Sequence, residues 1–343
     1  MSLPSHILVI RLSALGDIAM TVPVLRVMAK NYPGTKLTVL SRNYAQPLFS
    51  DIPGIGFLGA DLKGEHKGFG LLKLASDAKA LGIDAVADLH DVIRTKVIRN
   101  YLSIAGLQTA VIDKGRAEKK LLSSGDDKWF KQLKTTHQRY ADVFTDLGFT
   151  LNLSEHEFPE PAPVTPRLNS LMGTAPKKAI GIAPFAAYKS KMYPLEQTKE
   201  VISLLDASDD YKIFLFGGGK KEIDQLKKLE SEFQSVTNIA GQLTLSEELA
   251  LISNLDLLLS MDSSNGHLAT MYGVPVVTLW GVTHPYVGFA PFNQDAANHL
   301  MADRKQYPEI PTSVYGNRFP ESYEDAMKTI PAGKVVDKIL SLL

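Results

Sequence analysis

Short, uninterrupted runs of apolar residues recur along the chain and alternate with longer segments whose apolar residues lie three or four positions apart. The run at 7–10 and the run at 255–260 are typical of strands that are buried on both faces of a parallel sheet. The segments between the runs have the spacing of amphipathic helices. This alternation predicts an α/β protein in which parallel strands are joined by right-handed helical crossovers.

The predicted elements form two groups of similar size. In the first half we expect strands at 7–10, 36–41, 84–89 and 110–112, and helices at 18–31, 71–81, 92–104 and 135–147. In the second half we expect strands at 179–183, 211–216, 255–260 and 275–280, and helices at 195–205, 220–233, 245–253, 262–272 and 334–343. Residues 282–331 are expected to be irregular.

A proline-rich stretch at 153–177 separates the two groups and is typical of a linker. We therefore predict two doubly wound domains, at 1–160 and 177–330, with a C-terminal helix at 331–343 that could pack back on the N-terminal domain. Ligands of such domains bind at the carboxyl ends of the strands, so we expect a cleft there.

The amino-acid composition limits the kinds of catalytic and metal-binding site that the chain can contain. The 343 residues are 45% hydrophobic and include no cysteine, which excludes disulfides, thiolate nucleophiles, cysteine-ligated zinc and iron–sulfur clusters. The histidines and acidic residues show no spacing typical of a metal site, so we expect neither a metal nor a cofactor. The N-terminal apolar run is too short for a signal peptide or a membrane span, and we expect a cytoplasmic protein.

The formal net charge is zero, yet residues 92–139 contain 11 basic and 4 acidic residues. A basic zone within a neutral protein favours a localised anionic partner over nucleic acid. For any single residue, a solvated surface position remains the alternative. The candidate anion-binding residues of this zone are Arg94, Lys96, Arg99, Arg116, Lys120, His137 and Arg139.

Two loops that follow predicted strands could carry the chemistry. In the first, Gly16 permits a tight turn and Asp17 stands at a helix start, where it either caps free N–H groups or faces a ligand as a base. In the second, the segment Asp262, Ser263, Ser264, Asn265, Gly266, His267 opens a helix and suits a pyrophosphate. An ordinary capped turn with a core histidine is the alternative. Neither loop has a dinucleotide-binding fingerprint, a P-loop lysine or a nucleophile elbow.

Two further loops are weaker candidates. Lys189 and Lys191 follow the strand at 179–183 and could neutralise a diphosphate, or lie solvated at the surface. Gly217 and Gly218 follow the strand at 211–216, where a backbone without side chains lets a ligand approach, and Glu222 could bind a ribose or a base.

Three of these segments together resemble the lipopolysaccharide heptosyltransferases of glycosyltransferase family 9. The segment 7–17 is similar to the N-terminal signature of that family, 191–194 to its Lys-x-Trp-Pro element, and 262–281 to its donor-binding signature. The sequence departs from the family pattern at Tyr193, which stands for the tryptophan, and at Ser264, which stands for the glycine that appears here as Gly266.

The resemblance implies a GT-B fold, in which two Rossmann-like domains face each other across a cleft. It implies that the C-terminal domain binds a nucleotide sugar, typically ADP-heptose, and that the N-terminal domain binds an anionic glycolipid acceptor, the Kdo-bearing inner core on lipid A. By motif match, Asp17 would be the general base and Lys191 a diphosphate contact. Asp262, Ser263 and their neighbours would bind donor phosphate and ribose, while Ser13, Gly16 and the basic zone would hold the acceptor.

We therefore expect an inverting, metal-independent glycosyltransferase in which burial raises the pKa of Asp17 toward neutrality. Because the acceptor is anchored in a membrane, we expect the basic zone to give peripheral contact with the inner membrane. A nucleotide-sugar epimerase of the same fold, or an inactive nucleotide-sugar-binding protein, is the alternative.

Overall fold

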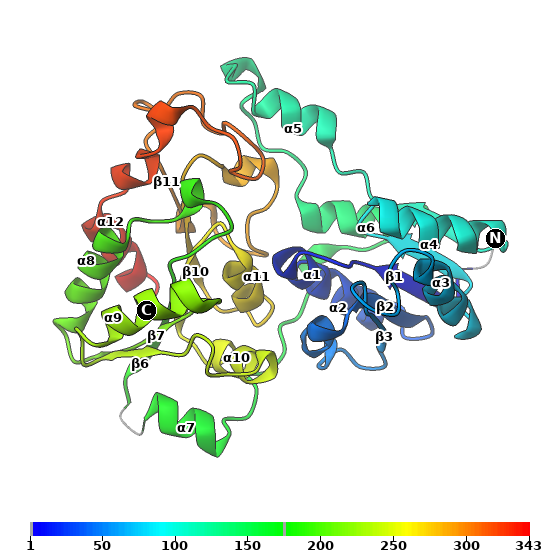
Figure 1. Ribbon diagram of the computed structural model, residues 1–343, viewed down its shortest axis with the longest axis horizontal. Coiled ribbons are helices and arrows are strands. Elements are labelled where there is room, and N and C mark those ends of the chain that lie inside the picture. Colours follow the sequence, from blue (N-terminus) through cyan, green and yellow to red (C-terminus); the bar gives the residue numbers. More distant parts are fainter. Residues whose placement is uncertain (1–2, 174–175) are drawn as a thin grey trace. The chain divides into compact units, whose positions relative to one another are not determined.

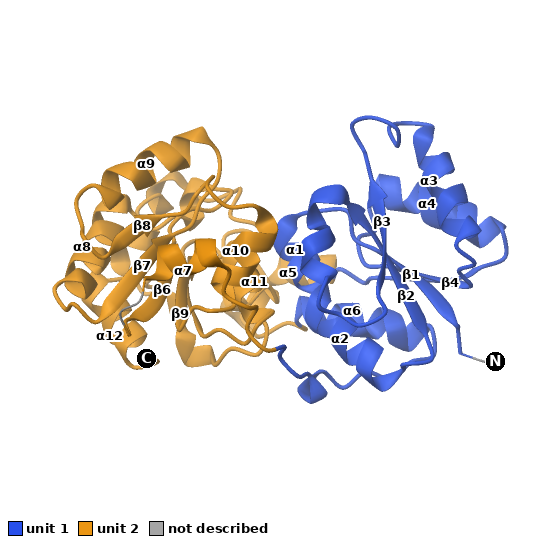
Figure 2. Ribbon diagram, turned by 90° about the horizontal axis from the view of Figure 1, so that it is seen from below, with its two compact units in different colours: residues 1–114, 135–159 blue, residues 115–134, 160–343 orange. Residues whose placement is uncertain are grey.

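The computed structural model describes residues 3–173 and 176–343. Met1 and Ser2, and Thr174 and Ala175 of the predicted linker, lie outside the described residues. The chain divides into two compact units (Figure 2). Unit 1 comprises Met1–Lys114 and Thr135–Pro159, and unit 2 comprises Gly115–Lys134 and Glu160–Leu343.

Unit 1 is built on a five-stranded parallel sheet in the order β3-β2-β1-β4-β5 (Figure 1). Its strands are β1 (His6–Ile10), β2 (Lys36–Arg42), β3 (Gly56–Ala60), β4 (Ala85–Asp88) and β5 (Gln108–Val111). Its helices are α1 (Leu15–Ala19), α2 (Thr21–Asn31), α3 (Gly70–Ala80), α4 (Ile93–Ile104) and α6 (Thr136–Asp146).

The core of unit 1 follows from the alternation of side chains between the two faces of each strand. Leu8 and Ile10 point to one face of β1 and pack with apolar residues of α3 and α4, such as Leu74 and Leu102. Helices α2 and α6 contact each other and carry their own buried apolar stripes. The strand order reverses between β1 and β4, so the carboxyl ends of these two strands form the topological switch point, where doubly wound sheets bind ligands.

Unit 2 is built on a six-stranded parallel sheet in the order β11-β10-β9-β6-β7-β8. Its strands are β6 (Lys178–Ala183), β7 (Tyr211–Leu215), β8 (Val236–Asn238), β9 (Leu257–Met261), β10 (Val276–Trp280) and β11 (His299–Met301). Its helices are α5 (Arg116–Leu122), α7 (Pro166–Met172), α8 (Leu195–Asp206), α9 (Lys220–Glu230), α10 (Leu245–Ile252), α11 (Ser264–Thr270) and α12 (Ala332–Leu340). The order reverses between β6 and β9, which is the switch point of this unit.

Some elements differ from the sequence prediction. The single helix expected at 18–31 is two helices, α1 and α2, that are separated at Met20. Helix α7 lies inside the predicted linker, where Thr165 caps it and Pro166 occupies its first turn, so this proline starts a helix. The short elements not predicted from sequence are β3, β8, β11 and α5.

The boundary between the predicted domains also needs correction, because residues 115–134 belong to unit 2. The Leu133 N–H donates to the Tyr286 carbonyl at 3.0 Å, and Arg304 pairs with Asp127 at 2.7 Å. The Arg304 guanidinium also stacks over the ring of Phe130. Leu122 and Leu133 of this segment also form a buried apolar cluster with Val287, so apolar packing and a few specific polar contacts together hold the segment in unit 2.

Helix α12 packs against α8 within unit 2, whereas the sequence-based expectation is that it could pack back on the N-terminal domain. Val335 and Ile339 join the apolar core that includes Val201 and Leu205 of α8. Across residues 3–173 and 176–343, no helix is both long and apolar enough to cross a membrane.

Candidate active site

The loop after β1 holds Asp17 in an ion pair. The Arg11 guanidinium lies 2.7 Å from Asp17 Oδ2, and its other terminal nitrogen donates to the Leu89 carbonyl at 2.8 Å. Asp17 Oδ2 also accepts from the Ala14 N–H at 3.2 Å, which is the capping interaction expected at this helix start. The carboxylate is still 28% exposed. Asp17 therefore caps the helix start and at the same time stays partly exposed at the switch point.

The loop after β4 is organised by a buried carboxylate. Asp88 accepts from the N–H groups of His90 and Asp91 at 3.0 and 2.9 Å, and from Arg99 at 2.7 Å. His90 in turn accepts the Leu12 N–H on Nδ1 at 3.3 Å, so the two loops of the switch point are tied together. Burial, together with the charges of Arg11 and Lys114, lowers the pKa of His90 to about 3. The imidazole is therefore neutral at physiological pH.

In unit 2 the carboxyl ends of three neighbouring strands converge. Lys191, beyond β6, lies 2.9 Å from Asp262 Oδ2, which directly follows β9. Thr283, beyond β10, is fully buried and donates its hydroxyl to the same carboxylate oxygen at 2.8 Å. The two charged side chains are 12% and 9% exposed. The Lys191 ammonium group is thus held at the switch point of the sheet by the buried Asp262 carboxylate.

The stem of Lys191 lies against Gly316, which adopts a positive φ of 79°. A Cβ at this position would come within 2.7 Å of two Lys191 side-chain carbons, and glycine is therefore required both by the backbone and by the space. Ser190 donates its hydroxyl to the Gly316 carbonyl at 2.5 Å and fixes the contact. Only the fold reveals this relationship, because 125 positions separate Gly316 from Lys191 in the chain.

Comparison with known proteins shows the family to which this chain belongs. The model of "Glycosyltransferase family 9 (heptosyltransferase)" matches residues 107–316, which is more than half of the chain. This chain is a member of that family. It is therefore a glycosyltransferase, and the sequence resemblance is confirmed.

Curated relatives and solved structures extend the comparison over nearly the whole chain. The chain is 26% identical to the lipopolysaccharide core heptosyltransferase OpsX of Haemophilus influenzae, over 84% of this chain and 82% of that protein. It is 24% identical to a lipopolysaccharide heptosyltransferase 3 of Escherichia coli, over 96% of both chains.

Among solved structures, a family 9 glycosyl transferase from Veillonella parvula superposes with a TM-score of 0.77 at 21% identity, covering 100% of this chain and 98% of that one. E. coli ADP-heptose lipopolysaccharide heptosyltransferase II superposes with a TM-score of 0.70 at 18% identity, covering 98% of each chain. These similarities confirm the GT-B fold class, with its pair of Rossmann-like domains.

The predicted acceptor residues of this family 9 protein lie on several elements and differ in burial. Arg94 and Lys96 are exposed on α4, whereas Arg99 is engaged with Asp88 beneath the switch-point loop. His137 and Arg139 are buried on α6, where Arg139 donates to the Asp113 carbonyl at 3.1 Å. Two further predicted acceptor residues, Arg116 and Lys120, are exposed on α5, in unit 2. The run of charge along the sequence is thus divided between two units.

Ser13, in the loop after β1, and Gly16, in the first turn of α1, are half-buried. Around α11, the Ser263 hydroxyl lies 3.2 Å from that of Ser260, and the Ser264 hydroxyl lies 3.4 Å from Asn265 Oδ1. Gly266 is packed closely, since a Cβ would meet Pro291 at 3.3 Å. His267 is buried on the same helix.

The remaining predicted donor residues have structural partners. The Gly218 N–H donates to Glu222 Oε2 at 2.8 Å, so Glu222 closes the glycine turn that also includes Gly217. The exposed ammonium of Lys189 pairs with Glu324. Of the two lysines in this segment, only Lys191 points to the carboxylate after β9.

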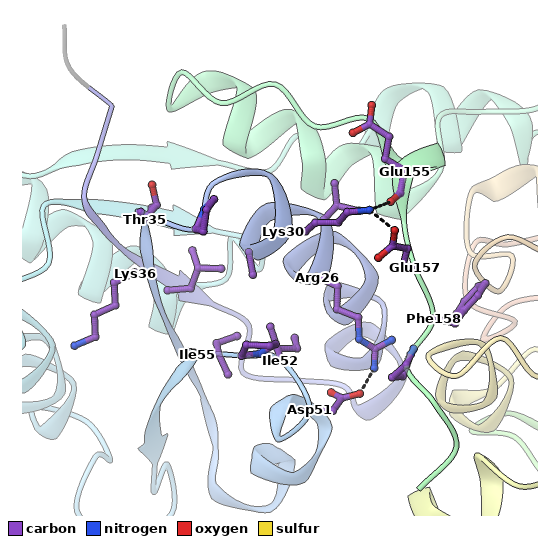
Figure 3. A pocket seen from close by; sticks show the side chains of 18 residues that line it. Arg26, Lys30, Thr35, Lys36, Asp51, Ile52, Ile55, Glu155, Glu157 and Phe158 are labelled. Atoms are coloured by element: carbon purple, nitrogen blue, oxygen red, sulfur yellow. Dashed lines mark hydrogen bonds and ion pairs between the residues drawn. The ribbon is translucent and has the colours of Figure 1, made fainter.

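Unit 1 contains a cavity of about 640 Å³ (Figure 3). It is lined by the end of α2, the start of β2 and the segment 155–159, and so opens at the amino ends of the strands. Four of its charged residues form two ion pairs, Arg26 with Asp51 and Lys30 with Glu157. The switch point is at the opposite edge of the sheet, so this cavity is not the candidate active site. Within 3–173 and 176–343, no cluster of three or more His or acidic residues could hold a metal.

Proposed function

We propose that this protein is an inverting, metal-independent heptosyltransferase that transfers a heptose from ADP-heptose to the Kdo-bearing inner core of lipopolysaccharide. The proposal rests on one observation: each of the two sheets of this family 9 chain has a charged side chain at its switch point. One presents the Asp17 carboxylate and the other presents the Lys191 cation. The names of the curated relatives, and solved family structures with ADP or an ADP-heptose analogue, support the choice of donor and acceptor.

The proposed reaction is a single displacement. Asp17 takes the proton of an acceptor hydroxyl while that oxygen attacks the anomeric carbon of the heptose. The bond from this carbon to the diphosphate oxygen breaks, ADP leaves with the bonding electrons, and the configuration inverts. General-base assistance of this kind contributes about 10²–10⁴-fold to the rate.

Lys191 is proposed to neutralise charge on the departing diphosphate, a task that a fixed ammonium performs without a cation from solution. Its position is supported by the contacts with Asp262 and Gly316. The proposed donor contacts also include Lys189, Gly217, Gly218, Glu222, Asp262, Ser263, Ser264, Asn265, Gly266 and His267. Because α11 has only seven residues, Lys191 is expected to contribute more than this helix end.

For the acceptor, we propose Ser13 and Gly16 beside Asp17, together with the basic residues of the 92–139 zone. Among these, Arg94 and Lys96 on α4, and Arg116 and Lys120 on α5, are exposed, as contact with a polyanion requires. The same side chains are proposed to give peripheral contact with the anionic inner membrane surface.

The deciding experiment is release of ADP from ADP-heptose by the purified protein, with and without a Kdo-lipid A acceptor. A heptosyltransferase releases ADP and extends the acceptor only when both substrates are present. An epimerase converts the donor without the acceptor, and an inactive binder takes up ADP in calorimetry but converts nothing. UDP-sugars, titrated in parallel, test the choice of nucleotide.

Membrane contact is tested separately by co-sedimentation with vesicles that contain phosphatidylglycerol. Binding should fall steeply between about 0.1 and 0.5 M salt, because the Debye length shrinks over this range. Reversal of charge at Arg116 and Lys120 should weaken binding at low salt. Binding that is insensitive both to salt and to lipid charge would contradict peripheral electrostatic contact.

A further inference from the structure

His90 lies at the switch point of unit 1 but has no part in the reaction described above. Strands β1 and β4 are hydrogen-bonded neighbours, with Ile10 opposite Asp88. The side chains just beyond these two positions therefore emerge at the same edge of the sheet. His90 follows Asp88 by two residues, and its side chain reaches the backbone of Leu12.

The hydrogen bonds fix both the position and the tautomer of the imidazole. The His90 main chain is bound to the fully buried Asp88 carboxylate, which Arg99 holds from the other side. Its Nδ1 accepts the Leu12 N–H at 3.3 Å, so in the neutral ring the proton is on Nε2. Neutrality itself follows from burial and from the nearby charges of Arg11 and Lys114.

The Nε2–H group is a donor that the described part of the chain does not use. His90 as a residue is more than nine-tenths buried, and within 3–173 and 176–343 its Nε2 has no hydrogen-bond partner; this atom is not among the fully buried ones and so keeps access to solvent. A donor at the accessible tip of a ring that is otherwise buried and fixed by hydrogen bonds is well placed to orient a ligand. Arg11 binds both the Asp17 carboxylate and the carbonyl of Leu89, the residue before His90, which places the donor in the neighbourhood of the proposed base.

We propose that His90 binds the acceptor, donating Nε2–H to a hydroxyl or carboxylate oxygen of the sugar that Asp17 deprotonates. This inference rests on the proposed function and adds a contact on the acceptor side. The neutral ring donates a hydrogen bond and does not act as a base, since the lone pair of Nδ1 already accepts the Leu12 N–H. The alternative is that His90 merely ties the two loops together.

Two amide substitutions separate these roles, because each replaces one nitrogen of the ring. In His90→Asn, the amide oxygen stands near the position of Nδ1 and can still accept from Leu12, but nothing replaces Nε2. In His90→Gln, the amide nitrogen reaches the position of Nε2, while the contact with Leu12 is lost. The measurements are the KM of a Kdo-lipid A acceptor, the Kd of ADP by calorimetry, and the Tm.

If His90 binds the acceptor, His90→Asn raises the acceptor KM roughly threefold to tenfold, the size expected for one lost hydrogen bond. Its Tm and its Kd for ADP stay close to those of the wild type. His90→Gln recovers most of the acceptor affinity but has a lower Tm. If His90→Asn has an unchanged acceptor KM, and His90→Gln loses only thermal stability, the residue is a structural tie and the inference is wrong.

The outcome for the proposed function is read independently from the wild type. If the wild type transfers heptose, the acceptor KM of the variants alone decides the inference. If it transfers none, the proposed function fails, and a deacylated Kdo saccharide is titrated into the wild type and His90→Asn with ADP present. Weaker binding to His90→Asn would support the inference, whereas equal binding, or none to the wild type, would overturn it.

Discussion

The guanidinium of Arg11 lies 2.7 Å from the carboxylate of Asp17 and, through its other terminal nitrogen, binds the Leu89 carbonyl beyond the neighbouring strand. One side chain therefore connects the ends of β1 and β4 and sets the direction of Asp17. The Tyr140 hydroxyl, 3.3 Å from the Asp17 carbonyl, holds the backbone of the same turn. Because the carboxylate is already fixed in this way, it loses no further conformational entropy when an acceptor hydroxyl binds.

Asp17→Asn should lower turnover by about 10²–10⁴-fold, because the amide cannot take the proton of the acceptor hydroxyl. The amide oxygen can still accept from the Ala14 N–H, so the helix start and the Tm should change little. Turnover is measured as ADP release, and ADP affinity by calorimetry. Near-normal turnover in this variant would remove Asp17 from the role of base.

Lys191→Met should weaken ADP binding roughly tenfold to 100-fold, since a charge-assisted contact with phosphate is lost. Thr283→Val should have a smaller effect in the same direction, because it removes the hydroxyl that orients the partner carboxylate Asp262. Thr283→Ser keeps the hydroxyl and is the matched control. Equal ADP affinity in the wild type and Lys191→Met would show that the diphosphate is bound elsewhere.

Much of this architecture could be predicted from the sequence, because buried parallel strands carry a strong local signal. The apolar runs at 7–10 and 255–260 correspond to β1 and β9, on each of which one candidate loop depends. Strands of three residues, such as β8 and β11, are too short to give a pattern of their own. They form because a neighbouring strand offers unpaired backbone groups, which is a property of the assembled sheet.

The candidate site was predictable only where one segment carried it. Asp17, in the helix start after β1, Asp262, directly after β9, and Lys191, in the loop after β6, were each predicted from their place after a strand, and their roles stay predictions. His90 could have been found by the same rule, since it follows a strand that becomes the neighbour of β1. Thr283 and Gly316 could not, because their importance arises from contacts with residues far away in the chain.

Gly316→Ala should reduce both stability and nucleotide affinity. The positive φ costs a side chain of the order of 1–3 kcal/mol, and the new methyl group would displace the stem of Lys191. Gly333→Ala in α12 is a matched control, because a methyl group added there would meet no atom within 4 Å and alanine favours the helix. A fall in Tm and in ADP affinity at Gly316 alone is expected. Unchanged ADP affinity would show that Lys191 does not depend on this glycine.

Unit 2 should lose stability as the pH falls below about 6.5, because His284 is buried in its neutral form. Burial, followed by the charges of Arg304 and His299, lowers its pKa to about 3. Between that pKa and the ordinary value near 6.5, the unfolded chain binds a proton that the folded chain does not. The free energy of unfolding therefore decreases by about 1.4 kcal/mol for each pH unit in this window.

His284→Asn tests this origin of the pH dependence. The asparagine oxygen can replace Nδ1 as the acceptor of the Tyr286 N–H, now 3.2 Å away, but it does not titrate. Below pH 6.5 the Tm of this variant should therefore fall less steeply than that of the wild type. His299, whose pKa is lowered to about 4 mainly by burial, should leave a residual slope. Parallel Tm curves for the two proteins from pH 7.5 to 5 would show that His284 is not the group responsible.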